Sequence, residues 1–231
     1  MTGGRRSGAG GRRRLAMRLR TAKGRSGSSQ RWLQRQLNDP YVAEAKRRGY
    51  RSRAAFKLME IDARHRLLAP GLRVVDLGAA PGGWSQVAAE RVRAAEGRGQ
   101  VVAIDLLPME PIPGVEVVQL DFLSADAPAR LTALLRDGRA DVVLSDMAAQ
   151  GTGHAATDHL RIMALAEAAA EFACQVLSPG GAFLCKVLQG GTERELLDRL
   201  KRAFASVRHV KPPASRAQSA ELYVLAQGFR S

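Results

Sequence analysis

Charged residues stand at the predicted ends of successive strands in this chain of 231 residues. They are four aspartates and one lysine: Asp76, Asp105, Asp121, Asp146 and Lys186. Aspartate is common where a strand turns into a loop, so a single one would carry little information. Four in succession, with a lysine inside an otherwise apolar strand, indicate a binding or catalytic site, because an unpaired buried charge is costly. Lys186 alone could also be a strand-end lysine that reaches solvent.

The glycine-rich segment 74–85, VVDLGAAPGGWS, is the most informative stretch of the chain. The apolar residues around Asp76 predict the end of a buried strand, and the following turn leads into a helix that starts near Trp84. Such a turn places backbone N–H groups next to a nucleotide-like ligand, and its glycines permit close approach. The pattern D-x-G-x-x-P-G-G differs from the G-x-G-x-x-G of dinucleotide sites, and no P-loop Lys-Ser/Thr follows. It resembles the first motif of S-adenosylmethionine-dependent methyltransferases.

Two aspartates at later strand ends fit a nucleoside ligand. Asp105 ends the second predicted strand and is placed to accept hydrogen bonds from ribose hydroxyls. Asp121 follows the third strand and could accept from an adenine amino group. Because ligands of such sheets bind outside the carboxyl ends of the strands, we expect both side chains at one edge.

Alternating strands and helices must hold these residues. The sequence predicts a helix that Asp39 caps and Gly49 ends, and a second helix over 53–65 that Ser52 caps. Strands are predicted near 72–77, 100–105, 115–120, 140–146, 182–188, 206–210 and 221–227, with Pro179, Gly180 and Gly181 ahead of the fifth. Further helices are predicted near 84–95, 127–136, 157–177 and 192–204. This order predicts a Rossmann-like α/β fold, with a mostly parallel seven-stranded sheet and helices on both faces.

Positive charge is concentrated at the start of the chain, whose formal net charge is +14. Residues 1–57 hold 17 Lys and Arg against two acids, whereas residues 58–231 hold 19 against 20 acids. A cationic segment ahead of a neutral globule is typical of a protein that binds nucleic acid, although a tail that only aids solubility is the alternative. We divide the chain into a basic leader expected to be disordered, 1–28, and one domain, 29–231, with N-terminal helices over 29–68 and the sheet over 69–231.

Composition excludes several other classes. No apolar run reaches the length of a signal peptide or a membrane span, so we expect a cytoplasmic protein without membrane contact. The Arg- and Ser-rich leader also fits a mitochondrial transit peptide, which stays the minority alternative. Cys174 and Cys185 are expected to be reduced, buried thiols. The four histidines lack the spacing of ligands, so no metal site is expected.

Several motifs together match one known family. They are 52–58 (SRAAFKL), 75–86 (VDLGAAPGGWSQ), 105–109 (DLLPM), 145–148 (SDMA), 215–217 (SRA) and 221–223 (ELY). In order and without a large insertion, they resemble the FtsJ/RrmJ ribosomal RNA methyltransferases over about residues 29–229, and even 31–34 (RWLQ) resembles the start of the family's body. The resemblance implies transfer of a methyl group from S-adenosylmethionine to the ribose 2′-hydroxyl of a uridine in large-subunit (23S) ribosomal RNA. It also implies a bacterial enzyme that acts during ribosome maturation, as a monomer on RNA within the large ribosomal subunit.

The resemblance further implies the site residues. The family's catalytic set falls on Lys57, Asp146, Lys186 and Glu221, and its cofactor-contacting positions fall on Gly82, Trp84, Asp105, Asp121 and Asp146. Methyl transfer requires the hydroxyl oxygen, the methyl carbon and the sulfur in line. Lys186 is the best candidate for the general base, which requires its neutral form. Lys57, the cofactor's positive sulfur and burial favour that form, whereas Asp146 and Glu221 oppose it but fix the lysine in place.

Six cations in the first part of the domain could hold the phosphates around the target nucleotide: Arg31, Lys46, Arg47, Arg48, Arg51 and Arg53. Aromatic residues make up only 5% of the chain, and no cluster of them resembles a base-stacking platform. We therefore expect recognition through phosphates and RNA shape.

Three other functions compete with this interpretation. An inactive RNA-binding ribosome assembly factor is disfavoured by the complete catalytic set. A base or small-molecule methyltransferase is disfavoured because neither Asn/Asp-Pro-Pro-Tyr/Phe after the fourth strand nor a catalytic cysteine is found. A 2′-O-methyltransferase of another RNA stays open. The chain departs from the family at 149–153 (AQGTG), where proline and asparagine are usual, and in its longer leader.

Overall fold

The computed structural model describes residue 30, residues 33–34 and 36–149, residue 151, residues 153–189 and residues 194–230. The leader 1–28, Arg31 and two residues of the altered loop, Gln150 and Thr152, lie outside the described residues. Within the described part, no helix combines the length and the apolar character that crossing a membrane requires.

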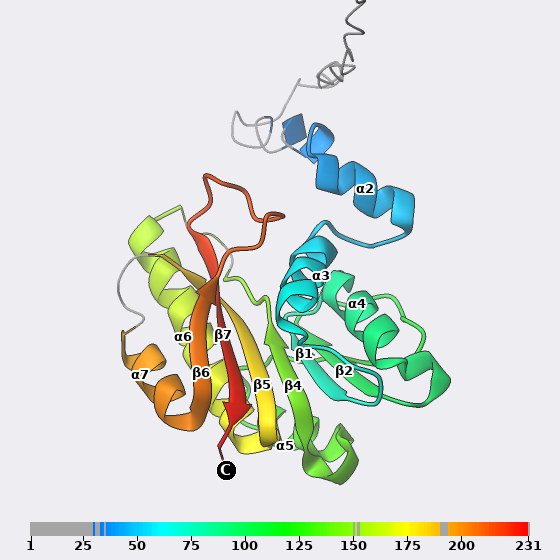
Figure 1. Cartoon of the computed structure of the whole chain (residues 1–231). Coiled ribbons are helices and arrows are strands. Elements are labelled where there is room, and N and C mark those ends of the chain that lie inside the picture. Colours follow the sequence, from blue (N-terminus) through cyan, green and yellow to red (C-terminus); the bar gives the residue numbers. More distant parts are fainter. Residues whose placement is uncertain are drawn as a thin grey trace, which may run out of the picture.

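A seven-stranded sheet forms the centre of the molecule (Figure 1). The strands are β1 (Arg73–Leu77), β2 (Gln100–Asp105), β3 (Val115–Gln119), β4 (Ala140–Ser145), β5 (Leu177–Leu188), β6 (Phe204–Val210) and β7 (Glu221–Phe229). Their spatial order is β3-β2-β1-β4-β5-β7-β6. Neighbours from β3 to β5 are parallel, and β7 runs antiparallel to both β5 and β6. The predicted mostly parallel α/β sheet is confirmed.

Helices cover both faces of this sheet. They are α2 (Pro40–Arg48), α3 (Ala54–His65), α4 (Gly83–Val92), α5 (Ala127–Leu134), α6 (Ala155–Val176) and α7 (Arg194–Ala203), with 3-10 turns at Ala94–Glu96 and Arg136–Gly138. Alternate residues of a strand point to opposite faces, so Val75 and Leu77 belong to the core on the side of α5, α6 and α7, whereas Val74 belongs to the core on the side of α3 and α4. Because both faces are buried, the central strands are almost continuously apolar.

Helix α2 has the expected ends and packs on α3. The Asp39 carboxylate accepts from the backbone N–H of Tyr41 at 3.0 Å, Pro40 occupies the first turn, and Gly49 ends the helix with φ +77°. Tyr41 packs on Phe56 of α3 with ring centroids 5.4 Å apart. Helices α2 and α3 therefore pack together through one small apolar cluster.

Ser52 does not cap α3, so that prediction was wrong. The helix begins at Ala54, the preceding Arg53 is already helical at φ −62°, and no side chain caps the first amides. The Ser52 hydroxyl oxygen is buried without a hydrogen-bond partner. A Cβ placed on Gly83 would lie 2.3 Å from that oxygen, so the serine packs against the first residue of α4 instead of folding back on α3.

Strand β5 begins five residues earlier than predicted. Leu177 already pairs with Ala140, and the next aligned pair is Ala182 with Val142, so extra residues of β5 bulge between these two pairs. A glycine at position 180 supplies the positive φ of +83° that such a bulge requires. The Pro-Gly-Gly segment, read as a turn before the strand, therefore lies within it.

The two cysteines are free, as expected, but only Cys185 is fully buried. Cys174 is half-buried, because it lies at the margin of the core that α6 covers. No three His, Cys, Asp or Glu side chains group as metal ligands among the residues that the structure describes.

Candidate active site

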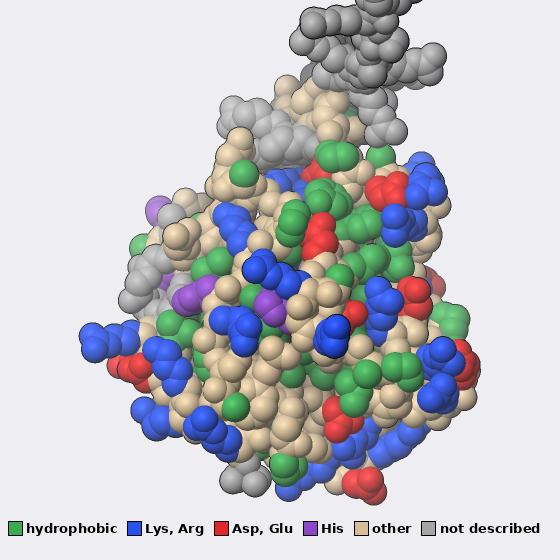
Figure 2. Space-filling view, in the orientation of Figure 1, with side chains coloured by type: hydrophobic (Ala, Val, Ile, Leu, Met, Phe, Trp, Pro, Cys, Tyr) green, Lys and Arg blue, Asp and Glu red, His purple; other side chains and the backbone are tan. Residues whose placement is uncertain are grey.

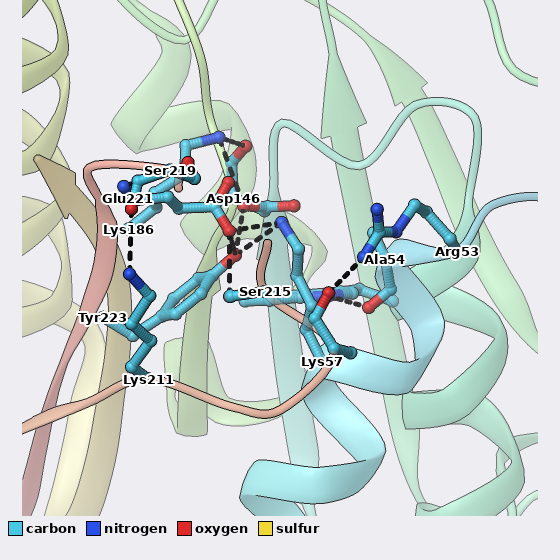
Figure 3. Close-up of polar contacts among 12 residues, drawn as sticks. Arg53, Ala54, Lys57, Asp146, Lys186, Lys211, Ser215, Ser219, Glu221 and Tyr223 are labelled. Carbon is cyan, nitrogen blue, oxygen red and sulfur yellow. Dashed lines mark hydrogen bonds and ion pairs between the residues drawn. The ribbon is translucent and has the colours of Figure 1, made fainter. Parts of the chain in front are cut away.

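Side chains of Lys57, Asp146, Lys186 and Glu221 meet above the carboxyl ends of β4 and β5 (Figure 3). They come from α3, the turn after β4, β5 and the first residue of β7, respectively. Lys57 Nζ lies 2.6 Å from Glu221 Oε1. Lys186 Nζ lies 3.2 Å from Asp146 Oδ1 and donates to the Asp146 carbonyl oxygen at 2.6 Å. The four residues thus form two ion pairs in one place.

The Tyr223 hydroxyl joins the two ion pairs. It donates to Asp146 Oδ1 at 2.9 Å, lies 3.2 Å from Glu221 Oε1, and accepts from Lys57 Nζ at 3.1 Å. Because Tyr223 is fully buried and faces two carboxylates, burial and these charges raise its pKa well above the ordinary value. The phenol therefore stays neutral and keeps the proton that it shares with the carboxylates.

Sequence reasoning missed this role of Tyr223, although a signal was present. Residues two apart on a strand share a face, so Tyr223 had to point to the same side as Glu221. In the antiparallel ladder Tyr223 also stands directly opposite Lys186. Pairing of β7 with β5, which the sequence did not reveal, makes the tyrosine the neighbour of the catalytic set.

Burial makes Lys186 dependent on its partners. Only 8% of the residue is exposed, and both of its oxygen contacts come from Asp146. Asp146 is itself fixed, because its backbone N–H donates to the Leu77 carbonyl oxygen at the end of β1. The simpler interpretation of Lys186 as a strand-end lysine that reaches solvent is therefore excluded.

Asp76 lies under the glycine-rich loop and is completely buried. The Ser85 hydroxyl donates to Asp76 Oδ2 at 2.6 Å, whereas Oδ1 is buried without a partner. Burial raises the pKa of Asp76 to about 7, with smaller contributions from the charges of Asp146 and Asp105, against the Ser85 hydrogen bond. A buried carboxylate oxygen with unused accepting capacity is suited to a donor group on a ligand.

Gly82 and Asp105 shape the loop above Asp76. Gly82 has φ +111°, and a Cβ there would lie 2.7 Å from Ile112 Cδ1, so a larger residue would be both strained and obstructed. Asp105 Oδ2 accepts from the N–H of Ala80 in the loop at 2.9 Å, and Oδ1 accepts from the N–H of Leu107 at 2.8 Å. The aspartate therefore links the glycine loop to the segment after β2, while its remaining lone pairs can accept from a ligand.

The remaining predicted cofactor residues, Trp84 and Asp121, both bond within the protein. The Trp84 side chain is 2% exposed, and its indole N–H donates to the Ala54 carbonyl oxygen at 2.8 Å. Any ligand contact of Trp84 would thus come from its backbone. Asp121 stands two residues after the end of β3, at the same edge as Asp105, and its Oδ1 accepts from the Leu123 N–H at 2.9 Å.

Arg51 connects the glycine-rich loop to the segment that follows β2. Its guanidinium donates to the Glu110 and Pro111 carbonyl oxygens at 2.6 and 2.7 Å, and to the Pro81 carbonyl oxygen at 3.3 Å. The Arg51 backbone N–H also donates to Gln86 Oε1 in α4 at 2.9 Å. These bonds use three of the five N–H donors of the Arg51 guanidinium within the protein, and its expected contact with phosphate stays a prediction.

Three of the other predicted phosphate-binding cations, Arg47, Arg48 and Arg53, are engaged in ion pairs within the protein. Arg47 and Arg48 each lie 2.6 Å from Glu44 on the exposed side of α2, and Arg53 is bonded to Asp39 and to the Ala214 carbonyl oxygen. Lys46 is exposed in the last turn of α2. On the face in Figure 2, Lys and Arg side chains form separate groups with acids between them. No single basic patch dominates that view.

A pocket of about 170 Å³ opens beside the ion pairs. Its lining comes from the helix that carries Lys57, from the chain before α2 and from the segment that leads into β7: Gln36, Arg53, Ala54, Lys57, Arg216, Ser219 and Glu221. The catalytic set thus has a small pocket next to it, and all of its lining residues except Ala54 are polar or charged. Two of the predicted catalytic residues form part of the wall.

Strand order, glycine loop and the partly buried Lys-Asp-Lys-Glu cluster together define a methyltransferase of the Rossmann-like class. The model of the FtsJ-like methyltransferase family matches residues 50–229, and the chain belongs to this family. A protein of Xanthobacter autotrophicus named ribosomal RNA large subunit methyltransferase E is 66% identical over 94% of this chain and 85% of its own length. A protein of the same name from Parvibaculum lavamentivorans is 63% identical over 99% and 93%.

A solved structure agrees with these relatives. The crystal structure titled as a putative ribosomal RNA methyltransferase from Plasmodium falciparum superimposes with a TM-score of 0.69 at 31% identity. The match covers 78% of this chain and 98% of that one. The chain is therefore a methyltransferase, as its motifs led us to expect.

Proposed function

We propose that this protein transfers a methyl group from S-adenosylmethionine to the ribose 2′-hydroxyl of a uridine in large-subunit ribosomal RNA. The assembled cluster of Lys57, Asp146, Lys186 and Glu221 is the observation that carries the proposal. The printed names of the relatives support the ribosomal substrate. We further propose that the protein acts as a monomer in the cytoplasm on RNA within the large subunit.

The residues around the glycine loop fit S-adenosylmethionine. Asp76 offers a buried carboxylate oxygen without a partner, which suits an ammonium group, and Gly82, with φ +111° and no side chain, lets the backbone of the loop approach a ligand. Asp105 and Asp121 lie at neighbouring strand ends, where they would hold the ribose and the adenine. When bound, this cofactor supplies an electrophilic methyl group on a positively charged sulfur.

Lys186 would act as the general base. Its Nζ contacts two oxygens of Asp146, and a neutral amine has two N–H donors and one lone pair, so the lone pair is left to accept from the ribose hydroxyl. A neutral Lys186 would take the hydroxyl proton while the oxygen–carbon bond forms and the carbon–sulfur bond breaks. Asp146 holds the amine in place and would stabilise the ammonium that results.

Lys57, Glu221 and Tyr223 would position the ribose. Lys57 and Glu221 stand 2.6 Å apart at the wall of the pocket, and both contact the Tyr223 hydroxyl. Their charges balance, so the neutral ribose meets donors and acceptors without a large excess of either sign. Pre-arranged groups of this kind lower the barrier because little reorganisation is needed during the reaction.

Mapping of ribose methylation in ribosomal RNA tests this function. A strain that lacks the protein should lose 2′-O-methylation at one uridine of the large-subunit RNA, and the wild-type gene should restore it. A gene for Lys186→Ala should fail to restore it. If ribose methylation were unchanged in the deletion strain while a base methylation disappeared, the proposed chemistry would be wrong.

A further inference from the structure

The pocket beside the catalytic set contains more positive charge than the reaction requires. Arg53, Lys57 and Arg216 line it, with Glu221 as the acid in the wall. Asp39 lies next to the pocket and contacts both arginines. A neutral ribose hydroxyl has no need of these two additional guanidinium groups, so the excess calls for an anionic ligand.

Two of the three cations are already committed. Lys57 is paired with Glu221 and bonded to Tyr223. Arg53 binds Asp39 through Nη1 and the Ala214 carbonyl oxygen through Nη2, and its side chain is only 15% exposed. These bonds hold Arg53 as part of the wall.

Arg216 differs from both. Its side chain is 37% exposed, and Nη2 makes a 3.3 Å contact with Asp39. Since a guanidinium carries five N–H donors in a planar fork, Arg216 keeps several donors for a ligand. It is thus the cation of the pocket wall with the capacity to bind an anion.

The segment that carries Arg216 is fixed in advance. The Ala214 N–H donates to Glu60 Oε2 at 2.7 Å, and the Ala214 carbonyl oxygen accepts from Arg53. Lys211, which precedes this point in the chain, donates through Nζ to the carbonyl oxygen of Ser219, which follows it, at 2.9 Å. Anchoring at both ends reduces the ordering cost when a ligand binds.

We propose that this pocket is a subsite for the phosphodiester of the target nucleotide, with Arg216 as its ligand. The inference rests on the proposed ribose methylation, because it uses the position of the reacting hydroxyl. The 3′-phosphate is attached to the ribose carbon next to the one that bears the 2′-hydroxyl. A hydroxyl at Lys186 therefore places a phosphate within one nucleotide of the cluster, and the pocket shares Lys57 and Glu221 with that cluster.

Asp39 has a defined part in this subsite as a positioning residue. Its carboxylate is 8% exposed and contacts Arg53, Arg216 and the Tyr41 N–H. When RNA is absent it keeps Arg216 at the pocket. A phosphodiester, which arginine can bind in a bidentate manner, would take the free donors of Arg216 while Asp39 retains Arg53.

Arg216→Ala and Arg216→Lys test the subsite, with Arg130→Ala as the matched control. Arg130 is a half-exposed arginine on α5 whose Nη1 lies 3.5 Å from Asp126, outside the pocket. Steady-state ribose methylation of purified large subunits gives KM and kcat, calorimetry gives the affinity for S-adenosylmethionine, and binding at several salt concentrations gives the salt slope.

For Arg216→Ala we expect KM for the subunit to rise at least about tenfold, as loss of a charge-assisted contact predicts, with kcat and cofactor affinity nearly unchanged. The logarithmic salt slope of subunit binding should fall by about 0.7–0.9, the value for one phosphate contact. Arg216→Lys should recover part of the affinity, since an ammonium cannot bind bidentately. Arg130→Ala should behave as wild type.

Two results would overturn the subsite. One is a KM and salt slope equal to those of wild type, and the other is a loss confined to kcat. Failure of the proposed function looks different. In that case the wild-type enzyme itself would not methylate the ribose, whereas failure of the subsite leaves wild-type ribose methylation intact.

Discussion

The phenolic oxygen of Tyr223 lies 2.9 Å from Asp146 Oδ1, in a position where no solvent reaches the ring. This bond couples the Asp146–Lys186 pair to the Lys57–Glu221 pair through one shared proton. The geometry of all four predicted catalytic side chains therefore depends on a residue that is not charged.

Tyr223→Phe should lower the methylation rate without unfolding the chain. The ring would keep its contact with Trp84, whose centroid is 5.6 Å away, while the bridge between the ion pairs would vanish. Loss of a hydrogen bond to a charged group costs about 1.5–3 kcal/mol, which predicts a decrease of roughly 10- to 100-fold in the single-turnover rate. Tyr50→Phe is the control, since that hydroxyl binds Glu90 away from the cluster at 3.0 Å. Equal rates for both variants would argue against the bridge.

Lys186→Arg separates base catalysis from charge stabilisation. A guanidinium keeps the positive charge but cannot release its proton near neutral pH, so the variant should be almost as slow as Lys186→Ala. Both should lose about 10²- to 10⁴-fold in single-turnover methylation of purified large subunits at saturating cofactor. Cofactor affinity should be nearly unchanged, because the glycine loop is untouched. An arginine variant with most of the wild-type rate would show that another group is the base.

Arg51→Ala should weaken binding of S-adenosylmethionine and leave RNA binding largely intact. The guanidinium binds the Pro81, Glu110 and Pro111 carbonyl oxygens. Its loss therefore disconnects the glycine-rich loop from the segment after β2, and both are part of the proposed cofactor site. We expect calorimetry to show at least about tenfold lower affinity. Arg47→Ala is the control, because that side chain pairs only with Glu44 on the surface of α2. An unchanged cofactor affinity together with a shallower salt slope for RNA would instead support the original assignment of Arg51 to phosphate.

Asp76 should make the stability of the cofactor-free protein depend on pH. Burial raises its pKa from 3.8 to about 7, so between these values the folded chain keeps a proton that the unfolded chain has released. Stability contributed by this group is therefore lost as the pH rises through that window. Compared with wild type, Asp76→Asn should show a flatter decline in the free energy of unfolding between about pH 5 and pH 8, measured by urea denaturation.

Ser85→Ala offers a check in the opposite direction. The Ser85 hydrogen bond lowers the pKa of Asp76, so its removal should extend the loss of stability to higher pH. If wild type, Asp76→Asn and Ser85→Ala declined in parallel, Asp76 would not be the group responsible.

The buried strands and the main motifs could be predicted from the sequence because they are local. Apolar runs with intervening glycines place Asp76, Asp105 and Asp146 at strand ends without knowledge of the strand order. Arrangement across the sheet is not local. That Tyr223 faces Lys186 follows from antiparallel pairing of β7 with β5, and no local pattern encodes that pairing.

Tertiary contacts set the interactions that Ser52 and Arg51 make. Serine before a helix normally caps it, and arginine near an RNA-binding site normally suggests phosphate. In the structure Gly83 packs against Ser52 and the predicted cap is absent, whereas Arg51 donates to three carbonyl oxygens and its contact with phosphate stays a prediction. Propensity and charge describe what a side chain can do, whereas packing determines which of those interactions it makes.

The position of β7 has a consequence for protein synthesis. This strand comes last in the sheet's chain order but lies between β5 and β6, and it supplies both Glu221 and Tyr223. A nascent chain that lacks β7 would have Asp146 available for Lys186, but Lys57 would lack both the acid and the phenol that bind it. Catalytic competence therefore arises only after translation of the last strand, when β7 enters between its two neighbours.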